Sequence, residues 1–273
     1  SYTAVVTPPT CTEKGYTTHT CSCGDSYVDT YTDALGHAWD SGKVTKQPTA
    51  TETGVRTFTC TRCGETKTES IPVVSVDVTQ MFTDVTKNWA YPGIQYCVTH
   101  GIMGGMGDGT FAPTGTTTRA QIVQILYNLE GTPAVSGTTP FTDLTANWYK
   151  DAVLWAYQTG VTSGTSETTF SPNDPVTREQ VAVFLARFAD RVLDRYTPYM
   201  WDALFPFQDR EQISYYARTA MNWACDLGLI KGIPGPGGLR LEPQSSATRE
   251  QMAVMIARFC RRLNVWNEPM PEL

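Results

Sequence analysis

The chain has 273 residues, of which 41% are hydrophobic and 18% are charged, a composition that supports packed cores and excludes wholesale disorder. With 21 basic against 27 acidic residues its net charge is −6, which disfavours nucleic acid or an anionic membrane as the main partner. The apolar runs are far shorter than the roughly 18 residues of a membrane span, so we expect no membrane insertion. No signal peptide is visible, and we expect a mature protein or a fragment of something longer.

The first part of the chain is rich in Thr and shows no helical periodicity. Thr alternates with aromatic residues, which predicts short, half-exposed β-strands. The segment that begins at Pro9 matches the one that begins at Pro48, and Cys21-Ser-Cys23 matches Cys60-Thr-Arg-Cys63. These matches predict two small Cys-containing β-hairpin repeats, over residues 1–39 and 40–79.

The cysteines of this part allow two chemistries. Four residues offer a Cys3His zinc site, namely Cys11, Cys21, Cys23 and His37. Against zinc, the spacing of Cys21 and Cys23 is tighter than the usual two-residue gap, and disulfides are the ordinary use of Cys in a small extracellular module. The sequence leaves zinc and disulfides as equal alternatives, and we expect no other cofactor.

Beyond residue 79 the apolar spacing becomes helical, and three signals recur in the same order. A Phe-x-Asp step stands at Phe82–Asp84, Phe141–Asp143 and Phe207–Asp209. A turn bounded by glycines follows at Gly101–Gly105, Gly160–Gly164 and Gly228–Gly232. A Thr-Arg-x-Gln string follows at Thr118–Gln121, Thr177–Gln180 and Thr248–Gln251. We expect three repeats of helix, turn, extended segment and helix, over residues 80–131, 140–194 and 205–265.

The Thr of each Thr-Arg-x-Gln string is well placed as the N-cap of the second helix. The Arg that follows then lies in the first turn, where free backbone N–H groups and the helix dipole favour an anion. Its guanidinium adds a two-pronged donor for carboxylate or phosphate. The other interpretation is structural, since each Arg could pair with the Asp of a Phe-x-Asp step. The residues alone leave both open.

Together the three segments resemble S-layer homology repeats, the modules that anchor bacterial surface proteins to cell-wall polysaccharide. The resemblance lies in the Phe-x-Asp step followed by Trp89 or Trp148, the Gly turn, the Phe-x-Pro step and the Thr-Arg-x-Gln string. It implies an all-α, pseudo-threefold bundle in a monomeric pseudo-trimer, so that the whole chain is an α+β multidomain protein. It also implies extracellular grooves between repeats that bind secondary cell-wall polysaccharide, typically pyruvylated.

Carried over by position, the expected polysaccharide-binding residues are Arg119, Arg178 and Arg249, the acidic residues Asp84, Asp143 and Asp209, the aromatic residues Trp89 and Trp148, and the turn residues Gly104, Gly164 and Gly232. The sequence departs from the family where Gln121, Gln180 and Gln251 replace the usual Glu. The third repeat is irregular, because Ser214 stands where Trp89 and Trp148 stand. We therefore expect polysaccharide binding in the grooves that use aromatic residues of the first two repeats, rather than in a groove that depends on an aromatic residue of the third.

The N-terminal part resembles small Cys-containing repeats of surface proteins from gut Firmicutes, through Pro-Thr-Cys-Thr-Glu-x-Gly-Tyr, Cys-x-Cys-Gly and Gly-His-x-Trp. We find no nucleophile elbow, His-Glu-x-x-His or phosphate loop, so we predict a non-catalytic surface anchor. The alternative is an adhesin or a lattice-forming protein whose β module binds a host or bacterial glycan or partner protein. An exposed aromatic platform would favour that alternative, and its candidate residues are Tyr16, Tyr27, Tyr31 and Trp39.

Overall fold

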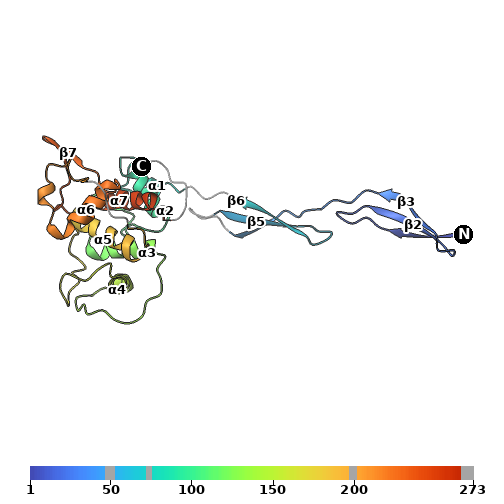
Figure 1. Cartoon of the computed structure of the whole chain (residues 1–273). Coiled ribbons are helices and arrows are strands. Elements are labelled where there is room, and N and C mark those ends of the chain that lie inside the picture. The colour runs from blue at the N-terminus through green and yellow to red at the C-terminus, as the bar shows by residue number, and fades with distance from the viewer. Residues whose placement is uncertain (47–52, 72–75, 197–201, 266–273) are drawn as a thin grey trace. The chain divides into compact units, whose positions relative to one another are not determined.

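A computed structural model describes residues 1–46, 53–71, 76–196 and 202–265 (Figure 1). The chain divides into two compact units, Ser1–Ser75 and Val76–Leu273. The sequence match that begins at Pro48, and part of the linker that follows Asp194, lie outside the described residues. None of the described helices has the length and apolar character needed to cross a membrane.

The N-terminal unit contains two antiparallel sheets of three strands each. The first sheet has the order β1-β2-β3, with β1 (Tyr2–Thr7), β2 (Gly15–Cys21) and β3 (Ser26–Thr32). The second has the order β4-β5-β6, with β4 (Lys43–Lys46), β5 (Gly54–Thr59) and β6 (Thr66–Ile71). The strands follow the Thr-rich pattern, but the expected hairpins are wrong in strand number. A further strand precedes each hairpin and pairs with it, as Val5 pairs with Thr18.

This unit has almost no hydrophobic core. Among its described residues, the buried ones are Cys11, Gly15, Gly54 and Cys60. The tyrosines Tyr16, Tyr27 and Tyr31 are exposed instead of forming a core. Apolar burial is the usual source of stability in small sheets. In this unit the backbone pairing of two narrow sheets has little such burial to stabilise it.

The C-terminal unit is mainly helical. After the short helix α1 (Val78–Met81), the first helices of the repeats are α2 (Tyr91–Thr99), α4 (Lys150–Gln158) and α6 (Arg218–Asp226). The second helices are α3 (Arg119–Leu129), α5 (Arg178–Arg191) and α7 (Arg249–Arg262). Short 3-10 helices are η1 (Asn147–Tyr149), η2 (Arg210–Gln212) and η3 (Tyr215–Ala217).

The all-α expectation needs a correction in the third repeat. There β7 (Ile233–Gly235) pairs with β8 (Gly238–Arg240) in a two-stranded hairpin. Gly237 and Gly238 at its turn have φ values of +87° and +139°, which side chains with a Cβ rarely adopt. The long Gly- and Pro-rich loop of this repeat therefore folds back on itself as a hairpin.

Each second helix begins at a capping box. The Thr118 hydroxyl accepts the N–H of Gln121, and the Gln121 side chain accepts the N–H of Thr118. Thr177 with Gln180 and Thr248 with Gln251 repeat this arrangement. The predicted helix starts are confirmed, and the Gln that replaces the family's usual Glu serves as the second half of the box.

The repeats pack in a closed cycle. The first helix of each repeat lies against the second helix of another, so α4 packs on α3, α6 on α5, and α2 on α7. A ring of three backbone hydrogen bonds, each 2.9 Å, connects the chain just before the second helices. In it Thr117 donates to Ala247, Ala247 donates to Val176, and Val176 donates to Thr117. The first and third repeats are thus joined as directly as neighbours in sequence.

Aromatic side chains from all three repeats form the core of this unit. Trp155 lies 6.0 Å from Phe188, and Phe188 lies 5.8 Å from Phe259, between ring centroids. The helix-centre residues Tyr96, Trp155 and Trp223 are all buried, as their equivalent places in the repeats predict. One apolar interior therefore holds the three second helices and fixes the positions of the residues between them.

Candidate functional site

The Asp of each Phe-x-Asp step fixes the extended segment of its own repeat. Both carboxylate oxygens accept consecutive backbone N–H groups at 2.7–2.9 Å. The donors are Phe111 and Ala112 for Asp84, Phe170 and Ser171 for Asp143, and Leu241 and Glu242 for Asp209. The second donor of each pair has a left-handed φ of 50° to 58°, which is uncommon for a residue with a Cβ. The carboxylates stabilise this conformation.

The motif Arg of each repeat crosses to the next repeat. The Nε of Arg119 donates to the carbonyl of Phe170 at 2.8 Å, and the Nε of Arg178 donates to the carbonyl of Leu241 at 2.7 Å. Arg249 completes the cycle by donating to the carbonyl of Phe111 at 2.7 Å. Its guanidinium also lies over the ring of that Phe, 4.6 Å from the centroid. Each guanidinium is thus held at a junction between two repeats.

These guanidinium groups do not form the ion pairs that the structural interpretation expects. Within the described parts of the chain, no Asp or Glu makes a salt bridge to Arg119, Arg178 or Arg249. Burial lowers the pKa of all three below its ordinary value, although an Arg this basic stays charged. The carboxylates of Asp143, Asp209 and Asp84 act on Arg119, Arg178 and Arg249 only at longer range. A buried cation that no carboxylate contacts directly favours the approach of an anion.

Three grooves lie beside these arginines. Groove A has a volume of about 290 Å³ and contains Arg119, Gly164, Gln180, Arg187 and Tyr216. Groove B has a volume of about 500 Å³ and contains Trp89, Arg178, Gly232, Gln251 and Arg258. Groove C has a volume of about 430 Å³ and contains Gly104, Gln121, Asn128, Trp148 and Arg249. Each groove takes its Arg from one repeat, its turn and second helix from another, and its aromatic residue from the third.

The aromatic residues of the grooves stand just before the first helices. Trp89, Trp148 and Tyr216 are 55–59% exposed, so one ring face is available to a ligand. The expectation that the third repeat lacks this aromatic residue is wrong. Two extra residues precede it there, so Tyr216, rather than Ser214, takes the place of Trp148 at the centre of its 3-10 helix.

Glu179 positions Tyr216. Its carboxylate accepts the Tyr216 hydroxyl at 3.0 Å and the N–H of Ser214 at 2.9 Å. Glu179 is buried in the first turn of α5, so it ties the third repeat to the second. An aromatic residue immediately before the first helix is the sequence signal that would have found Tyr216.

A second polar residue enters each groove nine positions after the motif Arg, and sequence reasoning missed it. The residues are Arg187, Arg258 and Asn128, and they donate to equivalent carbonyls of the Gly turn, those of Val161, Leu229 and Ile102. Grooves A and B therefore hold two guanidinium groups, whereas groove C holds one. In groove B, burial and then the charge of Arg178 lower the pKa of Arg258.

Gly104 lines groove C as expected, but it is not the residue of the first repeat that corresponds to Gly164 and Gly232. At Gly164 a Cβ would lie 2.5 Å from the ring of Phe141, and at Gly232 it would lie 2.6 Å from the ring of Phe207. Gly105 faces Phe82 in the same way, whereas Gly104 has open space at this point. Gly105 is thus the equivalent of Gly164 and Gly232. Gly104 contributes its carbonyl, which accepts Nη2 of Arg249 at 2.7 Å.

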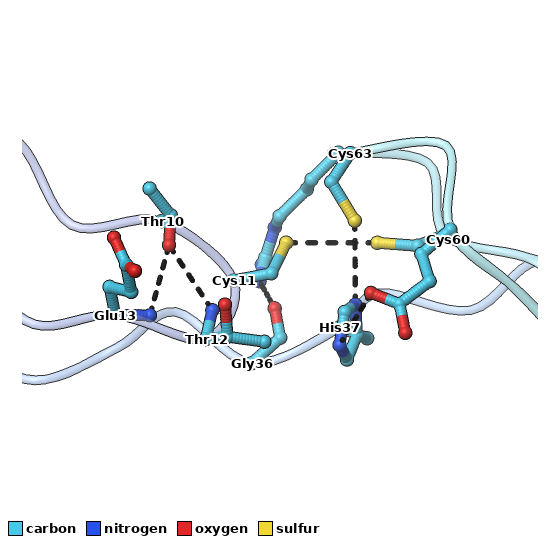
Figure 2. A network of polar contacts seen from close by, with 10 residues as sticks. Thr10, Cys11, Thr12, Glu13, Gly36, His37, Cys60 and Cys63 are labelled. Carbon is cyan, nitrogen blue, oxygen red and sulfur yellow. Dashed lines mark hydrogen bonds and ion pairs between the residues drawn. The ribbon is translucent and has the colours of Figure 1, made fainter.

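The cysteines of the N-terminal unit do not assemble as the sequence predicts. Cys21 and Cys23 bond to each other in a disulfide and are absent from the group formed by Cys11, His37, Cys60 and Cys63 (Figure 2). Of the four residues expected to gather here, Cys11 and His37 lie in this group, whereas Cys21 and Cys23 do not. The backbone explains the exchange, because Trp39 and Cys60 form a β-bridge that brings the second repeat beside His37.

Comparison with known proteins matches the S-layer homology domain at residues 82–123, 140–182 and 206–253. An endoglucanase of Bacillus sp. (strain KSM-635) is 31% identical over 64% of this chain and 18% of its own length. An amylopullulanase of Thermoanaerobacterium thermosulfurigenes is 30% identical over 64% of this chain and 9% of its own length. The surface-layer 125 kDa protein of Lysinibacillus sphaericus is 29% identical over 69% of this chain and 15% of its own length.

The chain thus spans less than a fifth of the length of these relatives. The shared part is the S-layer homology region, a non-catalytic anchoring module, and no catalytic domain is evident in the described residues. The chain therefore carries three tandem S-layer homology domains and belongs to the family of cell-surface proteins that contain them.

Proposed function

We propose that the C-terminal unit anchors the protein by binding secondary cell-wall polysaccharide in grooves A, B and C, and that the polymer carries pyruvate ketals. The observation that carries this proposal is a buried guanidinium that makes no salt bridge to a carboxylate and lies beside an exposed aromatic ring in each groove. A ketal carboxylate would bind the guanidinium, and the aromatic ring would cover a sugar face.

The site residues would divide the work. Arg119, Arg178 and Arg249 would bind the carboxylate, while Trp89, Trp148 and Tyr216 would contact the sugar. The aspartates Asp84, Asp143 and Asp209 would act as positioning residues, because their oxygens are occupied by the backbone N–H groups of the extended segments. Gly104, Gly164 and Gly232 would line the grooves with backbone atoms, and they offer no side chain that could distinguish one ligand from another. Metal ions have no part in this proposal for the C-terminal unit.

The proposal includes a pseudo-threefold arrangement within one chain. The cyclic packing of α2 on α7, α4 on α3 and α6 on α5 supports it, as does the ring of backbone hydrogen bonds. In such an arrangement no second chain is needed to complete a groove. The anchor would be monomeric and non-catalytic.

The grooves would differ in strength. Groove B combines Arg178 and Arg258 with Lys231, and groove A combines Arg119 with Arg187. Groove C has Asn128 at the second position, so an anionic ligand would meet only one guanidinium there. We expect grooves A and B to hold an acidic polymer more tightly than groove C.

A co-sedimentation experiment tests the anchor. The purified chain is mixed with cell-wall sacculi before and after acid extraction of the attached polysaccharide and its ketals. We expect binding to intact sacculi and loss of binding after extraction. Binding that survives extraction, or that is absent with intact sacculi, would contradict the proposal.

The exposed tyrosines of the first sheet favour a second candidate function for the N-terminal unit. Tyr16 and Tyr31 are exposed, with ring centroids 6.4 Å apart, and could contact a glycan or a partner protein. The N-terminal unit without residues 76–273 is mixed with host glycans or with extracted sacculi. Binding to either would support this adhesin-like role. Lack of binding to either surface would contradict it.

A further inference from the structure

We propose that Cys11, His37, Cys60 and Cys63 bind one zinc ion and that this ion joins the two β repeats of the N-terminal unit. One ligand atom of each residue lies within 4.8 Å of all the others (Figure 2). Three sulfurs and one imidazole nitrogen are a ligand set that suits structural Zn²⁺. This inference is independent of the proposed wall binding, which uses the other unit.

The distances within the group fit a tetrahedral ion. With Zn–S near 2.3 Å and Zn–N near 2.0–2.1 Å, a tetrahedron has S–S edges of about 3.8 Å and S–N edges of about 3.5 Å. The Sγ atoms of Cys11 and Cys60 lie 3.8 Å apart. The Sγ of Cys63 lies 3.4 Å from Nδ1 of His37. Two of the six edges thus match such a site, and all four ligand atoms lie within 4.8 Å of one another.

The imidazole is oriented as a zinc ligand would be. Nδ1 of His37 faces the sulfurs, while Nε2 lies 3.5 Å from the carboxylate of Glu65. Zinc-bound His usually donates its second ring N–H to a carboxylate or carbonyl, which fixes the ring and its tautomer. The indole of Trp39 stacks on the imidazole of His37, with ring centroids 4.8 Å apart.

The loop around Cys60 and Cys63 is a tight turn held against the first repeat. The N–H of Gly64 donates to the carbonyl of Cys60 at 2.9 Å, which closes the turn. Arg62 within it donates Nη1 to the carbonyls of Leu35 and Gly36, just before His37. The site is therefore positioned by backbone contacts as well as by its ligands.

The distribution of ligands between repeats supports a connecting role. Cys11 and His37 belong to the first repeat, and Cys60 and Cys63 belong to the second. Ala50 stands at the position of Cys11 in the second repeat, which is followed by the helical unit and not by a third β repeat within this chain. A ligand that serves the junction with the following repeat is thus present where that junction exists.

The unit also needs such a connection. Cys11 and Cys60 are its only buried side chains among the described residues, since the other two buried positions are glycines. Small domains without a hydrophobic core commonly depend on disulfides or a structural metal. A disulfide between Cys11 and Cys60 would use two of the four groups and leave the arrangement of Cys63, His37 and Glu65 without a purpose.

The test begins with metal analysis of the full chain. The protein is reduced, supplied with ZnCl₂ and freed of excess ion by gel filtration. Its zinc content is then measured by inductively coupled plasma mass spectrometry. We expect one zinc per chain, and visible absorption of tetrahedral thiolate-bound cobalt when Co²⁺ replaces it. Less than half an equivalent of zinc would overturn the proposal, as would peptide mapping of the untreated chain that finds Cys11 and Cys60 in a disulfide.

Variants locate the ion. Cys63→Ser and His37→Ala should each reduce bound zinc to below half an equivalent, whereas the double variant Cys21→Ser/Cys23→Ser is the matched control and should keep one equivalent. Zinc removal should also increase proteolysis within residues 1–75 without changing the melting temperature of the helical unit, because metal binding stabilises only the unit that contains it. Equal zinc in all variants would show that the ion binds elsewhere and would overturn the assignment.

Discussion

Tyr215 and Tyr216 are adjacent, but only Tyr216 lines groove A. Tyr215 is 94% exposed and lies outside the groove, which makes it a matched control. We expect Tyr216→Ala to weaken polymer binding by about three- to tenfold, the range of aromatic contact energies, and Tyr215→Ala to leave it unchanged. Titration calorimetry with isolated polymer measures both. Equal affinities of the two variants would contradict the role of the Tyr216 ring.

Arg187 and Asn128 occupy equivalent positions in grooves A and C, and both donate to a carbonyl of the Gly turn. We expect Arg187→Asn to weaken binding about tenfold and to reduce its salt dependence, because the carbonyl contact remains while a charged hydrogen bond is lost. Asn128→Arg should strengthen binding. Affinity is measured between low and high NaCl.

Arg191→Asn is the control for charge. This variant also removes one guanidinium from α5, but Arg191 lies outside groove A. Its guanidinium pairs with the carboxylate of Asp190. An effect of Arg191→Asn as large as that of Arg187→Asn would mean that overall charge, and not the groove, governs binding.

At this scale the sequence predicts residues that belong to a short motif and misses those that do not. Arg119, Trp89 and Trp148 lie in motifs and line the grooves as expected. Arg187 and Arg258 lie nine residues farther along, and only the packing of the repeats turns them into the same grooves. A comparison of equivalent helix positions among the three repeats would have drawn attention to them.

Among the helices, the capping boxes give the most direct stability prediction. Thr177→Ala removes the hydroxyl that accepts the N–H of Gln180, so we expect the free energy of unfolding to fall by about 1 kcal/mol. Thr219→Ala, at an exposed site within α6, should change it by less than about 0.5 kcal/mol. Urea unfolding followed by circular dichroism measures both. Equal effects would mean that the cap does not stabilise α5.

The elements also show where local patterns stop being informative. The starts of α3, α5 and α7 follow from a Thr and a Gln three residues apart, so the sequence predicts them well. The strands that precede the two hairpins, β1 and β4, were missed, because strand pairing connects segments whose own sequence patterns do not show which segment they pair with. The position of Tyr216 was missed because two inserted residues shifted the pattern.

At the scale of the whole molecule, the cycle of repeats predicts that no two of them suffice. A chain that ends at residue 196 lacks α6 and α7, so α5 and α2 lose the helices against which they pack. We expect this truncation to abolish the cooperative thermal transition of the helical unit, whereas deletion of residues 1–75 should leave its melting temperature unchanged. Differential scanning calorimetry compares them. A two-repeat chain that melts at the wild-type temperature would contradict the closed cycle.

The most direct single measurement is the dissociation constant of the full chain for isolated secondary cell-wall polymer, before and after mild acid removal of its ketals. Since a carboxylate–guanidinium hydrogen bond contributes about 1.5–3 kcal/mol, we predict that the affinity falls at least tenfold when the ketals are removed. Unchanged affinity would contradict the proposal that Arg119, Arg178 and Arg249 bind a ketal carboxylate.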